Sequence, residues 1–197
     1  MPRRIDTHER KEQLAEAVWR VIRDKGIGAV SVRTVAAEAG VAVGSLRHVF
    51  PTRTELVEFS ARLMVRRATE RLAATARTGD ARRDAVAILR HLIPLEPDSR
   101  AELEVNLALI AEAPATPELV PIRDEAYRAL LGLCAHLVAS LAPDLDETRL
   151  ATEARRLHAL VDGVALHLLT DPDTADTDWA VECLRDEVDR LAGSRPR

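Results

Sequence analysis

Residues 31–56 read SVRTVAAEAGVAVGSLRHVFPTRTEL, and this stretch decides the fold of the first part of the chain. Apolar residues recur at helical spacing from Val32 to Ala39, which predicts a short helix with one buried face. Ser31 can cap the free N–H groups at its start, and Gly40 follows where a left-handed backbone conformation is least costly. The stretch is therefore predicted to open with a capped helix that ends in a tight turn.

A second short helix is predicted to follow that turn. Its apolar residues, which should face inward, are Val43, Leu46, Val49 and Phe50. Its other face carries small and hydrogen-bonding residues, namely Gly44, Ser45, Arg47 and His48. A short helix with such a face, held at an angle to the helix before it, has the shape needed to enter the major groove of DNA. The two helices are therefore predicted to form a helix-turn-helix.

Residues 10–56 resemble the DNA-binding domain of the TetR family of bacterial transcription regulators. The matches lie in a first helix, the start of the second, the turn, the recognition helix and the start of a fourth helix, at positions 17–18, 21–22, 26, 31–36, 39–41, 43–46, 50, 52–53 and 55–56. The form GSLRHVF at residues 44–50 is similar to the subgroup around the choline-pathway repressor. The resemblance implies a regulator that binds double-stranded DNA.

The resemblance also implies which side chains contact DNA. They are expected to be Arg33, Thr34, Val43, Gly44, Ser45, Arg47, His48 and Arg53. The family usually carries a phosphate-contacting Tyr at the position of Arg47, so Arg47 is expected either to bind the backbone more strongly or to reach a guanine edge. The family usually carries Lys at the position of Arg53, and both Arg53 and Arg33 are expected to hold phosphates.

Charge is divided unevenly along the 197 residues. The chain holds 10 basic and 6 acidic residues through Thr54, a net of +4, and 18 basic and 26 acidic residues from Glu55 onward, a net of −8. A basic head on an acidic body suits a protein that holds phosphates at one end, although ordinary surface charge would also explain it. No run of 18 apolar residues and no secretory signal is present, so a cytoplasmic, nucleoid-associated protein without a membrane span is expected.

Almost every other segment also reads as helix, with prolines between the periodic stretches and no sustained alternation of period two. The fold class is therefore predicted to be all-α, with about nine helices. A three-helix helix-turn-helix domain is expected over residues 1–51. A helical ligand-binding and dimerisation domain is expected over residues 52–193, followed by a tail at 194–197.

The helices predicted at 147–169 and 177–191 are apolar over more than half of their circumference, which favours burial against a second subunit. By resemblance, the last two helices of such proteins pair with those of a partner as a four-helix bundle. The contact is expected to use Leu157, Leu160, Val161, Val164, Leu168, Val181, Leu184 and Val188. Packing inside one chain is the alternative. Gly163 is unfavourable inside a helix, and close approach of another helix is one reason for it.

The middle helices could enclose an effector pocket, as the resemblance implies. Its expected lining is Leu63, Leu103, Leu107, Ile110, Tyr127, Leu131 and Cys134, and a close-packed core is the alternative. After the helix-turn-helix the only aromatic residues are Phe59, Tyr127 and Trp179. Because caging a quaternary ammonium takes several aromatic faces, an apolar or neutral effector is expected rather than a choline-like one.

The sequence carries no pattern that indicates an enzyme. No two of the six histidines have i, i+4 spacing, and no phosphate-binding glycine loop or nucleophile elbow is present. No metal, cofactor or catalytic residue is therefore expected. The two cysteines, Cys134 and Cys183, are most simply buried thiols.

These observations together predict a transcriptional repressor that binds a palindromic operator as a homodimer and is released by a small-molecule effector. One alternative is an activator, or a DNA-binding protein that needs no ligand. Another, from a different class, is a helical small-molecule-binding protein whose helix-turn-helix is vestigial.

Overall fold

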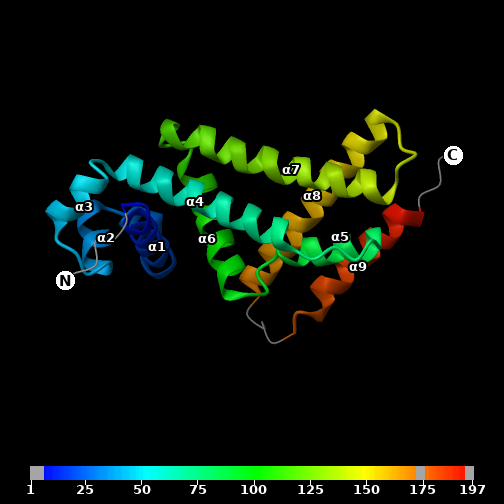
Figure 1. Ribbon diagram of the computed structural model, residues 1–197, viewed down its shortest axis with the longest axis horizontal. Coiled ribbons are helices and arrows are strands. Elements are labelled where there is room, and N and C mark those ends of the chain that lie inside the picture. Colours follow the sequence, from blue (N-terminus) through cyan, green and yellow to red (C-terminus); the bar gives the residue numbers. More distant parts are fainter. Residues whose placement is uncertain (1–6, 172–175, 194–197) are drawn as a thin grey trace. The chain divides into compact units, whose positions relative to one another are not determined.

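The computed structural model describes residues 7–171 and 176–193, and every regular element in these ranges is helical (Figure 1). The α-helices are α1 (Thr7–Lys25), α2 (Val32–Glu38), α3 (Val43–Val49), α4 (Arg53–Ala74), α5 (Ala81–Arg90), α6 (Pro97–Glu112), α7 (Val120–Leu141), α8 (Glu147–Thr170) and α9 (Asp178–Gly193). Two 3-10 turns, η1 (Ile27–Ala29) and η2 (Pro117–Leu119), complete the set. The predicted all-α class is confirmed for this part of the chain. The predicted tail at 194–197 lies outside the described residues.

The start and end of α2 follow the sequence signals. The Ser31 side chain accepts a hydrogen bond from Thr34 N at 3.1 Å, and Thr34 Oγ1 accepts one from Ser31 N at 2.9 Å, which completes a capping box. Gly40 follows with φ +64°, and the next amide, Val41 N, donates to Ala36 O at 2.9 Å. This backbone fold ends the helix and turns the chain toward α3.

The chain divides into two compact units, each built from segments that lie apart in the sequence, and the predicted domains 1–51 and 52–193 stay a prediction. Unit 1 contains residues 1–67 and 104–124, and unit 2 contains residues 68–103 and 125–197. The first part of α4, the second half of α6 and the start of α7 thus belong with the helix-turn-helix. The reason is apolar packing, because Leu56, Leu109 and Ile122 are buried in the same cluster as the head residues.

The core of unit 1 holds α1, α2 and α3 together. Val18 on α1, Val35 on α2 and Leu46 on α3 are fully buried and share one apolar cluster. Trp19 joins the same core, and its indole Nε1 donates to Ser60 O on α4 at 3.2 Å. Burial of a large side chain of this kind contributes about 1.5–3 kcal/mol, so these contacts fix the placement of the short α3.

Unit 2 has a core of its own, built from α5, α7, α8 and α9. Helix α9 packs against both α5 and α8. Asp80 caps α5 by accepting hydrogen bonds from Arg82 N and Arg83 N, which satisfies two of the free amides in its first turn. The buried Glu153 of α8 is paired with Arg190 of α9, which satisfies a charge that would otherwise be costly to bury.

The two cysteines differ in exposure. Cys134 on α7 is fully buried, and its burial raises the pKa of the thiol to about 12. Cys183 on α9 is exposed, so the expectation of a buried thiol is wrong there, because its position on α9 faces solvent. Among the described residues, no helix combines the length and apolarity needed to cross a membrane.

Candidate nucleic-acid interface

The exposed face of α3 carries the side chains that the sequence singled out. Leu46 faces inward with no exposed surface, and Val49 is half-buried. On the other side the helix presents Val43, which is 38% exposed, and the exposed residues Gly44, Ser45, Arg47 and His48. The structure therefore brings these five predicted contact residues together on one surface.

Helix α2 presents one of its two predicted contact residues to solvent. Arg33 is exposed, whereas the Thr34 hydroxyl lies inside the capping box and donates to Ala29 O at 2.7 Å. Thr34 thus holds the start of α2 to the η1 turn, a structural role that its place in the sequence did not predict. Its contact with DNA stays a prediction.

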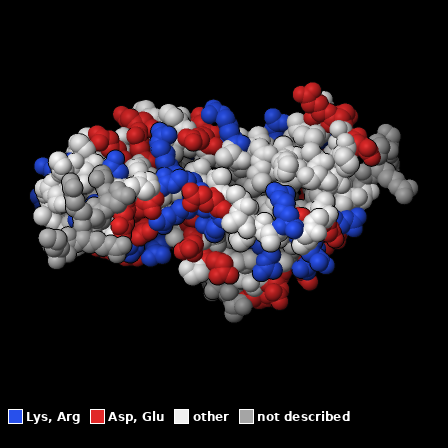
Figure 2. All heavy atoms as spheres, viewed as in Figure 1, with Lys and Arg blue, Asp and Glu red and all other residues white. Residues whose placement is uncertain are grey.

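The charge of the helix-turn-helix surface is weakly basic. Between residues 31 and 50 the single acidic residue is Glu38, and Arg20 on α1 neutralises it through an ion pair of 2.8 Å. Arg33 and Arg47 remain exposed. Figure 2 shows few charged atoms on the visible surface around α3. Such a surface can approach phosphates without repulsion.

Arg53, predicted to hold a phosphate, is turned toward other residues of unit 1. Its Nε donates to Val30 O at 2.9 Å, and its Nη2 donates to Ile27 O at 3.3 Å and to Glu112 Oε1 at 3.2 Å. The side chain is 32% exposed. The guanidinium thus has protein acceptors, and a phosphate contact stays a prediction.

The seven residues predicted to line an effector pocket fall in both units. Leu63, Leu107 and Ile110 belong to unit 1, and Leu103, Tyr127, Leu131 and Cys134 belong to unit 2. Leu63 and Cys134 are fully buried, whereas Ile110 and Tyr127 are about half-exposed. The pocket itself stays a prediction.

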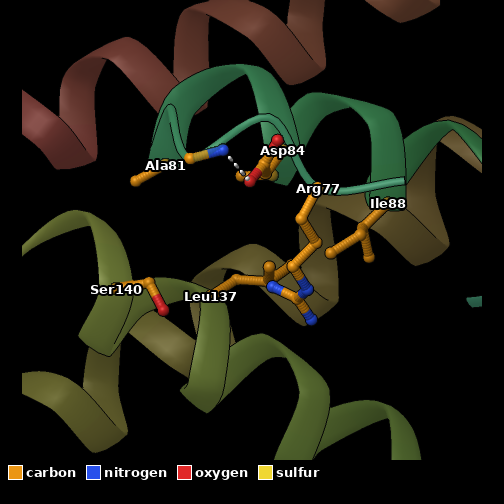
Figure 3. A pocket seen from close by; sticks show the side chains of 8 residues that line it. Arg77, Ala81, Asp84, Ile88, Leu137 and Ser140 are labelled. Atoms are coloured by element: carbon orange, nitrogen blue, oxygen red, sulfur yellow. Dashed lines mark hydrogen bonds between the residues drawn. The ribbon is translucent and has the colours of Figure 1, made fainter. Parts of the chain in front are cut away.

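A separate hollow of about 190 Å³ lies in unit 2 beside the start of α5, and none of the predicted pocket residues lines it (Figure 3). Arg77 extends toward Leu137 across it, and Ile88 forms part of its apolar wall. The nearly buried Asp84 accepts hydrogen bonds of 2.7 Å from both the amide and the hydroxyl of Thr78. These bonds lower the pKa of the Asp84 carboxyl below its ordinary value.

A polar group that sequence reasoning missed lies between α7 and α8. The ring of Tyr127 packs on the ring of His158 with centroids 4.9 Å apart, and His158 Nε2 is 3.3 Å from Asp162 Oδ2. His158 is buried even though Tyr127 is half-exposed. Helical spacing could have placed His158 and Asp162 on one face, but nothing in the sequence indicated Tyr127 as their neighbour.

The side chains predicted for the subunit contact lie in the core of a single chain. Leu157, Val161, Val164, Leu168, Leu184 and Val188 are buried in the cluster of unit 2, Val181 is buried, and Leu160 is partly buried against that cluster. Their part in a subunit contact stays a prediction. On the exposed side of α8, Leu166 is 46% exposed.

The capped α2, the left-handed turn and the exposed face of α3 define a DNA-binding protein of the helix-turn-helix class. Residues 14–58 match the description "Bacterial regulatory proteins, tetR family", and residues 81–193 match "BetI-type transcriptional repressor, C-terminal". The chain belongs to the TetR family, with a C-terminal region of the BetI type, and is a DNA-binding transcriptional regulator.

Relatives of known sequence or structure agree with this assignment. The regulator PksA of Bacillus subtilis (strain 168) is 34% identical over 97% of this chain and 94% of its own. A transcriptional regulator from Rhodococcus sp. Rha1 is 28% identical over 92% of this chain and 95% of its own, with a TM-score of 0.80. The multidrug binding protein EbrR complexed with ethidium is 27% identical over 93% of this chain and 98% of its own, with a TM-score of 0.65.

Proposed function

We propose that this regulator is a repressor that binds a pseudo-palindromic operator as a homodimer and leaves it when a small-molecule effector binds. The observation that carries the proposal is the exposed face of α3, where Ser45, Arg47 and His48 lie on the opposite side of the helix from the buried Leu46. In a symmetric dimer each α3 enters one major groove, and the two half-sites mirror the symmetry of the protein. The protein acts in the cytoplasm on the nucleoid and catalyses no reaction.

The proposed homodimer uses the exposed side of α8. Leu166 is exposed there, and Gly163 and Ala159 precede it by about one and two helical turns. A Cβ added at Gly163 would meet nothing within 4 Å in its own chain, so no neighbour in the same chain accounts for the glycine. Small residues on a long helix allow a partner helix to approach closely, which supports a contact between two copies of α8.

The proposed effector is an apolar or neutral small molecule that binds beside α7. Tyr127, Leu131 and Cys134 follow one another at helical spacing on this helix, and Tyr127 is 54% exposed. A half-exposed aromatic ring with aliphatic neighbours offers apolar contact area and few fixed charges. The relative EbrR is known in complex with ethidium, which is a cation, so a cationic effector is the competing outcome.

DNase footprinting upstream of the protein's own gene and its neighbours tests DNA binding and symmetry together. We expect two protected half-sites whose centres lie about one helical turn, or a multiple of it, apart. Loss of the gene should raise transcription from the footprinted promoter. A fall in transcription would contradict the repressor proposal, and the absence of any footprint would contradict the assignment of α3 to an operator.

The charge of the effector is tested with two probes of the same ring system. Ethidium carries a positive charge, and phenanthridine is its neutral parent. A ligand that binds only the folded state raises the melting temperature with concentration. We expect phenanthridine to raise the melting temperature of the protein and to release the operator. Ethidium intercalates into DNA, so it is tested on the protein alone, and we expect it to leave the melting temperature unchanged. Stabilisation by ethidium alone would contradict the neutral effector.

A further inference from the structure

The two carbonyl groups that Arg53 holds lie directly before the helix-turn-helix. Ile27 opens the η1 turn, and Val30, which is 2% exposed, precedes the N-cap residue of α2. Another oxygen of this turn, Ala29 O, accepts the hydrogen bond from the Thr34 hydroxyl. Side chains thus fix the backbone on which α2 begins, and Arg53 supplies two of the three bonds.

The acidic partner of Arg53 comes from a distant part of the chain. Glu112 is the last residue of α6 and lies 59 positions after Arg53. Its Oε1 also accepts a hydrogen bond from the Thr116 hydroxyl at 3.2 Å, and its side chain is only 23% exposed. A partly buried pair with a second hydrogen bond is screened less by salt than a surface ion pair.

We propose that Arg53 is a positioning residue rather than a phosphate contact: paired with Glu112, it fixes the start of α2 to the end of α6, and operator affinity depends on this pair. The planar guanidinium suits the task because it presents several donors in a fixed fork, whereas a Lys ammonium is a flexible point charge. A shift of the last turn of α6 would therefore move the backbone segment that leads into α2 and α3.

The direction in which one substitution changes DNA affinity separates positioning from phosphate binding. Glu112→Ala removes a negative charge and releases Arg53, so a phosphate contact predicts equal or tighter DNA binding. Positioning predicts weaker binding, by about tenfold, which is the order expected for a hydrogen bond between charged groups. Glu118→Ala serves as the matched control, because Glu118 is an exposed acidic residue of the same unit.

Arg53→Lys and Arg53→Gln supply the second criterion. A phosphate contact survives in the Lys variant and is lost in the Gln variant. The loss would reduce the slope of log K against the logarithm of salt concentration by about 0.9 in the Gln variant. Positioning predicts that both variants weaken operator binding to a similar extent and leave the salt slope of wild type unchanged. The double variant Arg53→Gln/Glu112→Ala should then be no weaker than the weaker single variant.

Operator affinity is measured by fluorescence anisotropy over a range of salt concentrations, with circular dichroism melts to confirm that each variant is folded. Wild type is measured first. If wild type does not bind the operator, the proposed function fails; if wild type binds and the variants bind equally well, only the proposal for Arg53 and Glu112 fails. Unchanged or tighter binding by Glu112→Ala, or wild-type affinity in Arg53→Lys, overturns the proposal. If Glu112→Ala does not fold, Arg53→Lys alone decides.

Discussion

Single residues of the helix-turn-helix fall into two groups that can be told apart by their partners. The hydroxyl groups of Ser31 and Thr34 form a hydrogen bond with each other, and the Thr34 hydroxyl also donates to Ala29 O of η1. Arg47 and His48, by contrast, are exposed on α3. The first group shapes the motif, and the second stays predicted to contact DNA.

Replacing Arg47 tests the second group directly. A bidentate contact between Arg and a guanine edge is worth about 1–3 kcal/mol of discrimination, so Arg47→Ala should weaken operator binding by that amount and reduce sequence preference. A backbone contact would instead weaken specific and non-specific binding alike. Binding to operator and to random DNA is compared by anisotropy, with Arg185→Ala on the exposed side of α9 as the control. Unchanged affinity in Arg47→Ala would remove Arg47 from the interface.

Asp84 gives the protein a defined pH dependence. The hydrogen bonds from Thr78 and Gly79 lower its folded pKa, so the carboxylate contributes its full stability above the ordinary pKa of about 3.9. That contribution is lost as the pH falls through the folded pKa. Asp84→Asn should therefore lower the melting temperature at about pH 7, and its difference from wild type should shrink at about pH 3.

The exposed Asp144, in the turn after α7, is the matched control for this measurement. Its replacement by Asn should leave the melting temperature nearly unchanged at both pH values. A difference between Asp84→Asn and wild type that stays constant with pH would show that the charge of Asp84 contributes nothing.

Among the elements, α8 has two faces with different tasks. Val161 lies on the face buried in unit 2, and Leu166 lies on the exposed face. Leu166→Glu should leave the monomer folded and abolish the proposed homodimer, because it would place an unpaired charge in the proposed contact between subunits. Val161→Glu should lower the melting temperature sharply, because the charge is buried in a single chain at a cost of several kcal/mol.

Sedimentation velocity and circular dichroism separate these two outcomes. His136→Glu, on the exposed side of α7, is the control for an added surface charge and should change neither mass nor melting temperature. A dimeric Leu166→Glu protein would move the subunit contact away from this face of α8.

Local signals made the elements predictable. Ser31 as a cap and Gly40 as a left-handed turn depend on neighbours within a few residues, and both were found as predicted. The role of Arg53 was not predictable, because Ile27 and Glu112 reach it only through tertiary packing. The apolar stripe of Val161 predicted burial correctly, but a stripe does not tell whether the covering surface belongs to the same chain or to another.

At the scale of the whole molecule, each of the two units has its own apolar core. Leu46 in unit 1 and Leu157 in unit 2 are both fully buried, in separate clusters. Leu→Ala at such sites costs about 2–5 kcal/mol. We expect Leu46→Ala to speed amide hydrogen exchange mainly in unit 1, and Leu157→Ala mainly in unit 2, as measured by mass spectrometry. A uniform increase over both units in either variant would mean that they unfold as one cooperative block.

The two thiols provide a reporter for the intact protein. Thiolate is the reactive form of cysteine, and the buried Cys134, whose pKa is raised to about 12, stays protonated and shielded near neutral pH. A maleimide fluorophore or nitroxide should therefore attach to the exposed Cys183 on α9 alone. The wild-type chain thus accepts one spectroscopic label without mutagenesis. In a symmetric pair, energy transfer or dipolar coupling between the two labels would follow subunit geometry as DNA and effector are added.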